Sequence, residues 1–504
     1  MVVAQCQSLA SSASNRNSHT GSSTASLSSV FSNNLTNSLA QAATVSFSTT
    51  YYFPHFALGG GWQTVLTYVN YSPGPATCQT DFYGDDGTPL AVPFADTGSS
   101  PTRTDSLAAG GELHQQSQVD PTGPQVNGWA IGQCTGPVKA SLLFRLFSGG
   151  TAVGEAGVNA TTTPSNQFVT YAQTLTGVAW ANPSTTTGAN VTISALNASG
   201  VVQKSISFNV PPMQHSANNI GPMLGITNFT GSVQVSADQP IVSLSINAEA
   251  FPAFSSLPPG DLDGTIPLAD GTGKGSGNAN APTTYYLPHF AIAGGWQTVL
   301  TYVNFSNQTV SCTTNFFGDD GSPLAVNFGA GASATRNDVL APGGEIHQIS
   351  QANTSGTAVT GWAQGQCTGP VKASLLFRLF ANGTAIGEAG VNASTVPTTE
   401  FVSYAQTAAG FALANVSPAA AVVTITALDS TGAFQGTTSV NLNPNAHYSN
   451  NVGPLLGIGG FNGSVQITST QPLVSLSLNA EAFPAFSSLP PGDLAAGTAL
   501  APGH

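Results

Sequence analysis

The chain contains the same apolar, uncharged stretch twice. PHFALGGGWQTVLTYVN occupies residues 54–70, and PHFAIAGGWQTVLTYVN occupies residues 288–304. Other stretches recur without any change: GQCTGPVKASLLFRLF at 132–147 and 365–380, and AEAFPAFSSLPPGDL at 248–262 and 480–494. The chain is therefore a tandem duplication of a unit of about 210 residues, and repetition on this scale restricts the fold to architectures built from copies.

Each unit contains a second, weaker duplication. In both of its parts an apolar strand signal is followed by Asn, a turn rich in Ser, Pro or Gly, an alternating strand, and a late strand after GP or QP. The alternation in VTISAL and SVQVSA is typical of half-buried strands, and the Asp-Gly of DDGTP and DDGSP favours hairpins. Helical periodicity is nearly absent. We therefore predict an all-β fold of four tandem antiparallel β-sandwich (Ig-like) domains, arranged as a duplicated two-domain unit.

The predicted domain limits follow from these repeats. The composition of the first residues predicts a disordered low-complexity segment, although its β-prone end, ATVSFSTTYYF, could add as a strand to another chain's sheet edge. Cys6 in this segment would be a free thiol, an intermolecular link or a lipid site. The linker between the units, rich in Gly, Pro and Asp, should be semi-flexible. The limits are a low-complexity segment at 1–45, sandwiches at 46–162, 163–258, 284–396 and 397–490, a linker at 259–283 and a tail at 491–504.

The remaining cysteines form two pairs with nearly equal spacing. Cys78 and Cys134 are 56 residues apart, and Cys312 and Cys367 are 55 residues apart. No CxxC motif or His cluster accompanies them, so two intradomain disulfides are favoured over zinc sites, with four buried free thiols as the alternative. Trp129 stands five residues before Cys134, which suits a core packed against the first disulfide. Disulfides indicate an oxidising compartment.

The composition excludes several classes of function. Charged residues make up 6% of the chain and apolar residues 41%, whereas an average soluble domain has about 25% charged residues. The formal net charge is −13 and the nine Lys and Arg do not cluster, so neither nucleic acid nor an anionic lipid surface is an expected partner. No run of about 20 apolar residues occurs, so no membrane insertion is expected. A surface of hydroxyls and amides is typical of exported β-rich proteins, and we predict an extracellular or cell-surface location.

No motif for catalysis or for cofactor binding is present. The chain lacks a G-x-S-x-G nucleophile elbow, a P-loop, the strand and helix context of a GxGxxG motif, and an EF-hand. We therefore predict no enzyme activity, no cofactor and no metal site. Asp85 and Asp86, repeated in the second unit, are interpreted as Asp-Gly turn residues, with weak calcium binding at a domain junction as the alternative.

Several other titratable residues recur in both units. Glu112 and His114 lie two apart on a predicted strand and would face the same side; we interpret them as a surface ion pair rather than as a metal or acid–base pair. His55 follows Pro between aromatic residues and is interpreted as a hydrogen-bonded structural imidazole. Arg378 and Glu388 flank an Asn-Gly turn, and an ideal two-residue hairpin puts them on opposite faces unless a β-bulge intervenes, which the sequence leaves open.

Aromatic residues near the domain starts are the best binding candidates. Trp62, Trp296, Tyr52 and Tyr286 would stack on sugar rings if they are exposed, as in carbohydrate-binding modules. Aromatic side chains of sandwiches lie more often in cores and at domain junctions, which is the alternative. The repeated AEAFPAFSSLPPGDL is interpreted as an apolar clasp that ties a domain end to its neighbour.

The motifs GGGWQTVLTYVN, DDGTPL, VKASLLFRLF and QPIVSLSINA, spread over about residues 46–490, resemble those of tandem Ig-like or fibronectin-III-like β-sandwich repeat proteins exported by bacteria. Many such proteins are surface or matrix proteins, so the resemblance implies an extracellular, non-catalytic role. We expect a non-enzymatic structural or adhesive protein, a string of four sandwiches that self-associates into a filament or surface layer. The alternative is an array of glycan-binding modules that uses exposed aromatics.

Overall fold

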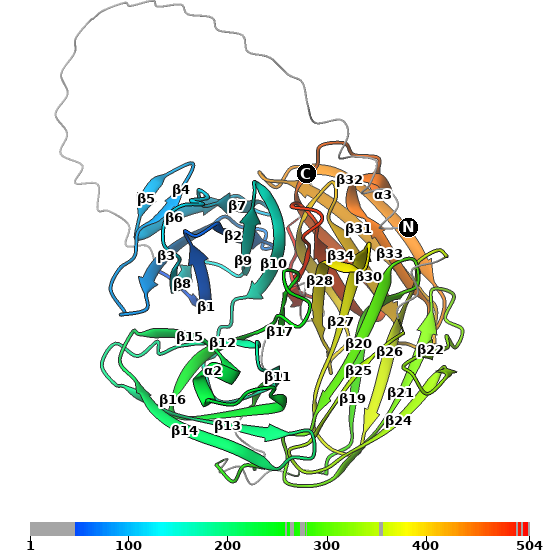
Figure 1. The fold of residues 1–504 in the computed structure, drawn as a ribbon. Coiled ribbons are helices and arrows are strands. Elements are labelled where there is room, and N and C mark those ends of the chain that lie inside the picture. Colours follow the sequence, from blue (N-terminus) through cyan, green and yellow to red (C-terminus); the bar gives the residue numbers. More distant parts are fainter. Residues whose placement is uncertain are drawn as a thin grey trace, which may run out of the picture.

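The computed structural model describes residues 46–257, 260–262, 267–272, 278, 280–351, 356–489, 492–494 and 497–501. Regular structure in these residues is almost entirely antiparallel β-strand (Figure 1), so the predicted all-β fold is confirmed. The predicted low-complexity segment and Cys6 lie outside the described residues. None of the helices found in the described ranges has the length and apolar character needed to cross a membrane.

The first strand group (49–159) consists of two antiparallel sheets with an apolar core of buried side chains. One sheet has the order β1-β8-β3-β6 and the other the order β10-β9-β2-β7, while β4 and β5 form a separate ribbon. The strands are β1 (Thr49–Leu58), β2 (Trp62–Asn70), β3 (Ala76–Gly84), β4 (Val92–Phe94), β5 (Gly98–Ser100), β6 (Thr102–Leu107), β7 (Glu112–Gln116), β8 (Val126–Cys134), β9 (Val138–Ser148) and β10 (Thr151–Asn159).

The second strand group (165–262) is organised around one long strand. The first part of β16 pairs with β11 and β13, and its last part pairs with β12 and β17, so the strand passes from one layer to the other. The elements are β11 (Ser165–Gln173), β12 (Gly177–Ala181), β13 (Ala189–Asn197), β14 (Val202–Val210), β15 (His215–Asn219), α2 (Ile220–Leu224), β16 (Thr230–Asn247), β17 (Ser255–Leu257) and β18 (Gly260–Leu262).

The third strand group (283–392) repeats the sheets of the first group, with the orders β19-β26-β21-β24 and β25-β20-β27-β28 and a short β22-β23 ribbon. It has its own apolar core. The strands are β19 (Thr283–Ile292), β20 (Trp296–Val303), β21 (Val310–Gly318), β22 (Val326–Asn327), β23 (Ala332–Ser333), β24 (Thr335–Leu340), β25 (Glu345–Ile349), β26 (Val359–Cys367), β27 (Lys372–Ala381) and β28 (Thr384–Asn392).

The fourth strand group (398–494) repeats the second, with the long β34 in the place of β16. We call the first two groups the first half and the last two the second half; the domain limits given above stay predictions. The elements are β29 (Thr398–Gln406), β30 (Gly410–Asn415), β31 (Ala421–Asp429), β32 (Phe434–Leu442), β33 (His447–Asn451), α3 (Val452–Leu456), β34 (Asn462–Asn479), β35 (Ser487–Leu489) and β36 (Gly492–Leu494).

The first residues of the repeated apolar stretch end β1 and β19, and the rest of the stretch forms β2 and β20. β2 and β20 are buried on both faces. In β2, Tyr68 faces the core of the first group. On the other face, Val65 packs against Leu489 and Val69 packs against Val402, both from the second half. Because both faces are covered, the strand has no polar alternation, as a fully buried strand requires. Each half thus covers the central strand of the other half.

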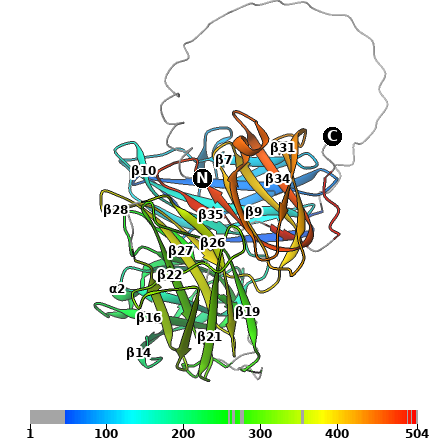
Figure 2. The same ribbon diagram turned by 90° about the vertical axis from the view of Figure 1, so that its right-hand side faces the viewer.

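The four strand groups close into a ring. The first packs on the second through β1 and β16, the second on the third through β11 and β20, the third on the fourth through β19 and β34, and the fourth on the first through β29 and β2. Figure 1 shows β10, β17 and β28 near the centre of this ring, and Figure 2 shows it from the side. The expected end-to-end string is therefore wrong, because the apolar backs of β2 and β20 are covered by groups distant in sequence.

Parts of the predicted linker and tail are also packed into the ring. β18 pairs with β11, and Leu268 is buried beside Phe305 of the third group. At the other end, β36 pairs with β29, and the buried Ala501 donates its N–H to the carbonyl of Tyr71 at 2.9 Å. The prediction of a semi-flexible linker is wrong for these residues, since they hold neighbouring groups together.

Both predicted disulfides are present, and each joins neighbouring strands of one sheet. Cys78 on β3 lies opposite Cys134 on β8, and Cys312 on β21 lies opposite Cys367 on β26. The expectation that Trp129 packs against the first disulfide is wrong. Its indole lies in a cluster between the first and second groups, because side chains five residues apart on a strand point to opposite faces.

Candidate binding site

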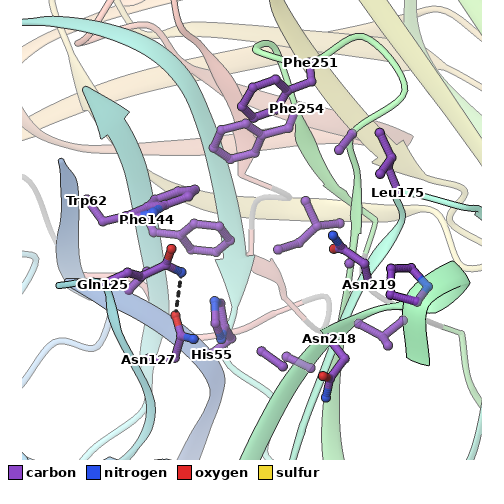
Figure 3. Close-up of a pocket in the computed structure, with 18 residues that line it drawn as sticks. His55, Trp62, Gln125, Asn127, Phe144, Leu175, Asn218, Asn219, Phe251 and Phe254 are labelled. Atoms are coloured by element: carbon purple, nitrogen blue, oxygen red, sulfur yellow. Dashed lines mark hydrogen bonds between the residues drawn. The ribbon is translucent and has the colours of Figure 1, made fainter. Parts of the chain in front are cut away.

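A cavity of about 600 Å³ opens where the first and second strand groups meet, a contact that we call the first seam. Most of its lining comes from β1, β2, β8 and β9 of the first group, from β12, β15 and β16 of the second group, and from residues 248–254 after β16 (Figure 3). Gln125, Leu175 and Pro222 of α2 complete it. Sites for small molecules have volumes of about 300–1,000 Å³. The cavity therefore has the size of a ligand site.

One wall of the cavity is aromatic. The ring centroid of Trp62 lies 5.9 Å from that of Phe144 and 5.6 Å from that of Phe254. Phe251 and Leu175 also belong to the lining and are 62% and 56% exposed, so the apolar surface continues to the outside. The aromatic side chains among these offer flat apolar faces to an occupant.

The other walls carry neutral amides. Gln125 Nε2 donates a hydrogen bond to Asn127 Oδ1 at 2.9 Å, on the side of the first group (Figure 3). On the side of the second group, Asn218 is held by Ser216 at 2.9 Å, and Asn219 precedes α2 without capping it through its side chain. No Asp, Glu, Lys or Arg is among the 18 lining residues. The lining is therefore polar at several points but carries no charged side chain of these types.

The floor of the cavity contains His55, which is held by a chain of hydrogen bonds across the first seam. His215 Nδ1 lies 2.7 Å from Asp85 Oδ1, and His215 Nε2 lies 3.2 Å from His55 Nδ1. Burial, and secondly the nearby His215, hold the pKa of His55 well below its usual range, so its ring is neutral at neutral pH. The prediction of a structural imidazole agrees with this chain.

With His215 neutral, the chain also determines which nitrogen of His55 is free. An ionised Asp85 can only accept, so His215 donates through Nδ1 and, when neutral, accepts at Nε2. His55 Nδ1 must then donate, and His55 Nε2 keeps its lone pair. Among the described residues none donates to His55 Nε2, and His55 lines the cavity. An occupant with a hydroxyl group could donate to this atom.

Within the part of the chain that the structure describes, the equivalent contact of the third and fourth groups, the second seam, is closed. It keeps the same histidine chain, with His447 2.8 Å from Asp319 and 3.1 Å from His289. The space beside His289 is only about 20 Å³ and is lined by Phe411 among others. This volume is close to that needed for a single water molecule.

Sequence differences between the halves explain why only one of these two seams is open. Phe411 stands opposite Ser477 in the pairing of β30 with β34, the position that Val178 holds opposite Ser245 in the first half. The phenyl ring of Phe411 is larger than the side chain of Val178 and therefore occupies more of the second seam. In the second half the amide of Gln125 is replaced by Ala358, since Val126 and Val359 have equivalent positions at the ends of β8 and β26.

The structure separates the four aromatic binding candidates. Trp62 lines the open cavity. Trp296, its counterpart, is 5% exposed and packs against Phe377 and Phe486. Tyr52 packs near Trp129 and Tyr286 near Trp362, in apolar clusters away from the cavity lining. Sequence reasoning missed the amides and the phenylalanines of the lining, and it did not place His55 in a cavity. A comparison of the two repeats could have found Gln125 and Val178, since Ala358 and Phe411 stand at the equivalent positions, but not His55 or the phenylalanines, which are the same in both repeats.

The question left open for the turn-flanking charges is resolved by a register shift. In the second half, a shift at Leu379 and Phe380 places Arg378 directly opposite Glu388, on the same face of the sheet. The two side chains form a buried ion pair, and Glu249 of the first half binds the same guanidinium. A β-bulge thus converts two opposite-facing positions into one charged site between the halves.

Glu112 and His114 are not the surface ion pair that was predicted. His114 Nε2 lies 3.2 Å from Glu481 of the second half, and its ring stacks on Tyr404 with centroids 4.1 Å apart. Glu112 is 9% exposed and accepts a hydrogen bond from Asn462 at 3.2 Å. Burial raises the pKa of Glu112 to about 8. Both residues face the second half because the ring closes over this strand.

Of Asp85 and Asp86, only Asp86 has the predicted role in the turn through its side chain. Asp86 Oδ1 accepts from the N–H of Thr88 at 2.9 Å, as expected at an Asp-Gly turn, while Asp85 binds His215. In the described ranges no group of three or more His, Cys, Asp or Glu side chains is arranged to hold a metal ion. The turn therefore also anchors the histidine chain of the first seam.

Comparison with known proteins gives no family. No family model matches the chain, and no curated protein matches it. Among solved structures, a candidate beta-galactosidase from Bacteroides fragilis matches with 12% identity and a TM-score of 0.11, over 52% of this chain and 33% of that one. A glycosyl hydrolase family 2 member from Bacteroides cellulosilyticus matches with 8% identity and a TM-score of 0.10, over 52% of this chain and 29% of that one. The aligned region thus spans about a third of each of these two proteins. Similarity this low carries no argument about function.

Proposed function

We propose that this protein is a non-enzymatic extracellular protein that binds one neutral carbohydrate chain in the cavity of the first seam. The observation that carries the proposal is the contrast between the seams. Both have the same strands and the same histidine chain, yet one holds about 600 Å³ and the other about 20 Å³. A cavity that packing could have filled, and does fill in the other repeat, suits a ligand.

The chemistry of the lining favours a carbohydrate. A sugar ring has an apolar C–H face that can lie on Trp62 and hydroxyl groups around its edge that need hydrogen-bond partners. The amides of Gln125 and Asn219 can donate and accept, and His55 Nε2 can accept. The absence of Asp, Glu, Lys and Arg from the lining favours a neutral ligand, because a charged one would lose its hydration without gaining a partner.

A binding role rather than catalysis is favoured by the same residues. Hydrolysis of a glycoside usually needs two carboxyl groups beside the scissile bond, and the lining contains no carboxyl group. The chain from Asp85 to His55 recurs in the closed second seam, which favours an architectural role for it. The two disulfides support an oxidising, extracellular environment.

The test is isothermal titration calorimetry of the full chain with cellotetraose, maltotetraose, xylotetraose and chitotetraose. We expect one site per chain for at least one of these neutral sugars. Val178→Phe copies the residue of the closed seam and should abolish that binding, whereas Phe411→Leu, a change at the equivalent position of the second seam, should leave it intact. Absence of binding to all four sugars, or unchanged binding by Val178→Phe, would refute the proposal. Binding of the neutral apolar dye Nile red without any sugar would assign the cavity to an apolar ligand instead.

A structural or adhesive role through self-association is the second candidate. It is favoured by two sheet edges, β14 and β32, each nine residues long and each ending its sheet. Natural edges are commonly protected by charge or Pro, but these two strands contain one charged residue, Lys204, and no Pro. Light scattering and electron microscopy should then show oligomers that grow with concentration, and these should diminish in Ser439→Lys, a change at an exposed position of β32. A monomer at every concentration would exclude this role.

A further inference from the structure

The segment after β16 touches the cavity and the second half of the chain at the same time. We call residues 248–257 the first clasp. Ala248, Phe251 and Phe254 line the cavity. Glu249 and Ser255, which alternate with them, bind residues of the third strand group. The clasp therefore connects the wall of the site in the first half with the body of the second half.

Glu249 is the charged one of the two anchors. Its Oε2 accepts a hydrogen bond from the guanidinium of Arg378 and lies 3.3 Å from His347 Nε2, and its Oε1 accepts from Gln173 Nε2 at 3.0 Å. Burial opposes its ionisation, but the hydrogen bond from His347 and the charge of Arg378 lower the pKa of Glu249 to about 2. The carboxylate is therefore ionised and held at three points.

Ser255 provides the second anchor, one residue after the cavity wall. Its Oγ donates to Glu388 Oε1 at 2.6 Å, and Asn247 Nδ2 donates to the same oxygen at 3.0 Å. The Glu388 side chain has no exposed surface and is paired with Arg378. β17, which begins at Ser255, packs against β28 of the third group. Phe254 is therefore held between Glu249 and Ser255, and both neighbours bind the second half.

The second half has a matching clasp at 480–489, which serves as an internal control. Glu481 binds Arg145 and His114 of the first half, as Glu249 binds Arg378 and His347. The aromatic residue of this clasp, Phe486, packs on Trp296 at the closed seam. The two glutamates thus have equivalent arginine and histidine partners, but only Glu249 belongs to a segment that itself lines the open cavity.

We infer that Glu249 is a positioning residue for the carbohydrate site and that the second half shapes the cavity of the first half through Arg378 and His347. This inference rests on the proposed function, since it concerns the same site. Movement of Glu249 would displace Phe251 and Phe254, which form part of the cavity lining. Because linkage between two sites is reciprocal, a bound sugar would also stabilise the contact between the clasp and the second half.

The first experiment compares Glu249→Gln with Glu481→Gln in the full chain. Each substitution keeps the shape of the side chain and removes the charge opposite a buried arginine, so both should lower the thermal midpoint to a similar extent. We expect Glu249→Gln to weaken binding of the tightest of the four tetrasaccharides by about 10-fold, a typical coupling between sites. Glu481→Gln should leave it within about 2-fold of the parent chain. Equal affinities of the two variants would overturn the inference.

The second experiment uses the unsubstituted chain, so it does not depend on either variant folding. Hydrogen exchange is measured with and without a saturating concentration of the same tetrasaccharide. We expect slower exchange in the first clasp and in β28, which contributes nothing to the cavity lining, and no such change in Val178→Phe. Protection confined to the cavity strands would overturn the inference and leave the proposed function standing. If none of the four sugars binds, both fall.

Discussion

Glu112 should make this protein less stable as the pH rises above neutral. The residue lies at the contact between the first and fourth groups, with Asn462 as its hydrogen-bond partner and with His114 and Tyr404 close by. Burial raises the pKa of Glu112 from 4.5 to about 8. The folded protein therefore keeps this carboxyl protonated between these two values, where the unfolded chain has lost the proton.

The sign and size follow from the linkage between proton binding and folding. Where the folded state binds more protons, stability falls as the pH rises, so the contribution of Glu112 is fully present below pH 4.5 and lost as the pH passes through about 8. A difference of one pKa unit corresponds to about 1.4 kcal/mol. The difference between 4.5 and 8 then corresponds to at most about 5 kcal/mol in the free energy of unfolding. Because the residue is 9% exposed, water screens part of this effect, and we expect about 3–5 kcal/mol.

The perturbation is Glu112→Gln, which keeps the acceptor for Asn462 and cannot ionise. The assay is guanidinium unfolding of both proteins between pH 5 and pH 9. At pH 5 the two stabilities should be similar, and at pH 9 the variant should be more stable by about 3–5 kcal/mol. Glu345→Gln at the equivalent position is a control for the size of the effect. Because burial raises the pKa of Glu345 only to about 7, we expect a smaller gain in the free energy of unfolding, about 2–3 kcal/mol.

Other titrating groups do not confuse this comparison. Burial lowers the pKa of His55 and of His289, so their contribution to stability grows as the pH rises towards 6.5. Both histidines are present in every protein compared and cancel in the difference. A difference between Glu112→Gln and the parent chain that is the same at pH 5 and pH 9 would show that Glu112 is already ionised in the folded protein and would refute the reasoning.

Three further outcomes can be checked with standard assays. Trp62→Ala should weaken sugar binding, measured by calorimetry, by at least about 10-fold. Trp296→Ala should keep the affinity but lower the free energy of unfolding by about 3–5 kcal/mol, because its indole is buried. The opposite pattern would contradict the assignment of the open seam. Reduction of the two disulfides, which close segments of 56 and 55 residues, should lower the free energy of unfolding by about 4 kcal/mol each, and unchanged unfolding after complete reduction would contradict it. Phe411→Val should open the second seam and lower the thermal midpoint of the chain, with a loss of about 2 kcal/mol, and an unchanged midpoint would show that Phe411 is not what fills it.

Much of the fold can be predicted from local patterns in the sequence. Alternation in VTISAL and SVQVSA, Asp-Gly turns and the repeat itself depend on neighbouring residues only, and they indicate antiparallel strands in copied sets. The two cysteine pairs could be assigned from spacing, because the duplication repeats them. The face of the strand on which Trp129 lies can also be predicted, because side chains alternate between the two faces and residues five apart point in opposite directions. The prediction that Trp129 packs against the disulfide of Cys134 did not take this into account.

The candidate site could be predicted only in part. Trp62 stands out by type, but nothing in its own stretch distinguishes it from Trp296, since both follow glycines and begin the same apolar strand. What separates them is Val178 in one half and Phe411 in the other, more than a hundred residues away from either indole. The space in front of the tryptophan therefore depends on side chains that lie far from it in the sequence.

The sequence alone determined that the chain is all-β, uncharged over most of its surface and built from two copies, because these properties are set by composition and by the period of side chains along a strand. Only the tertiary structure decided that the copies close into a ring, that a bulge puts Arg378 opposite Glu388, and that Glu249 of one half completes this pair. The reason is that these contacts join residues that can be more than a hundred positions apart, and their formation depends on how whole sheets pack rather than on any local preference of the chain.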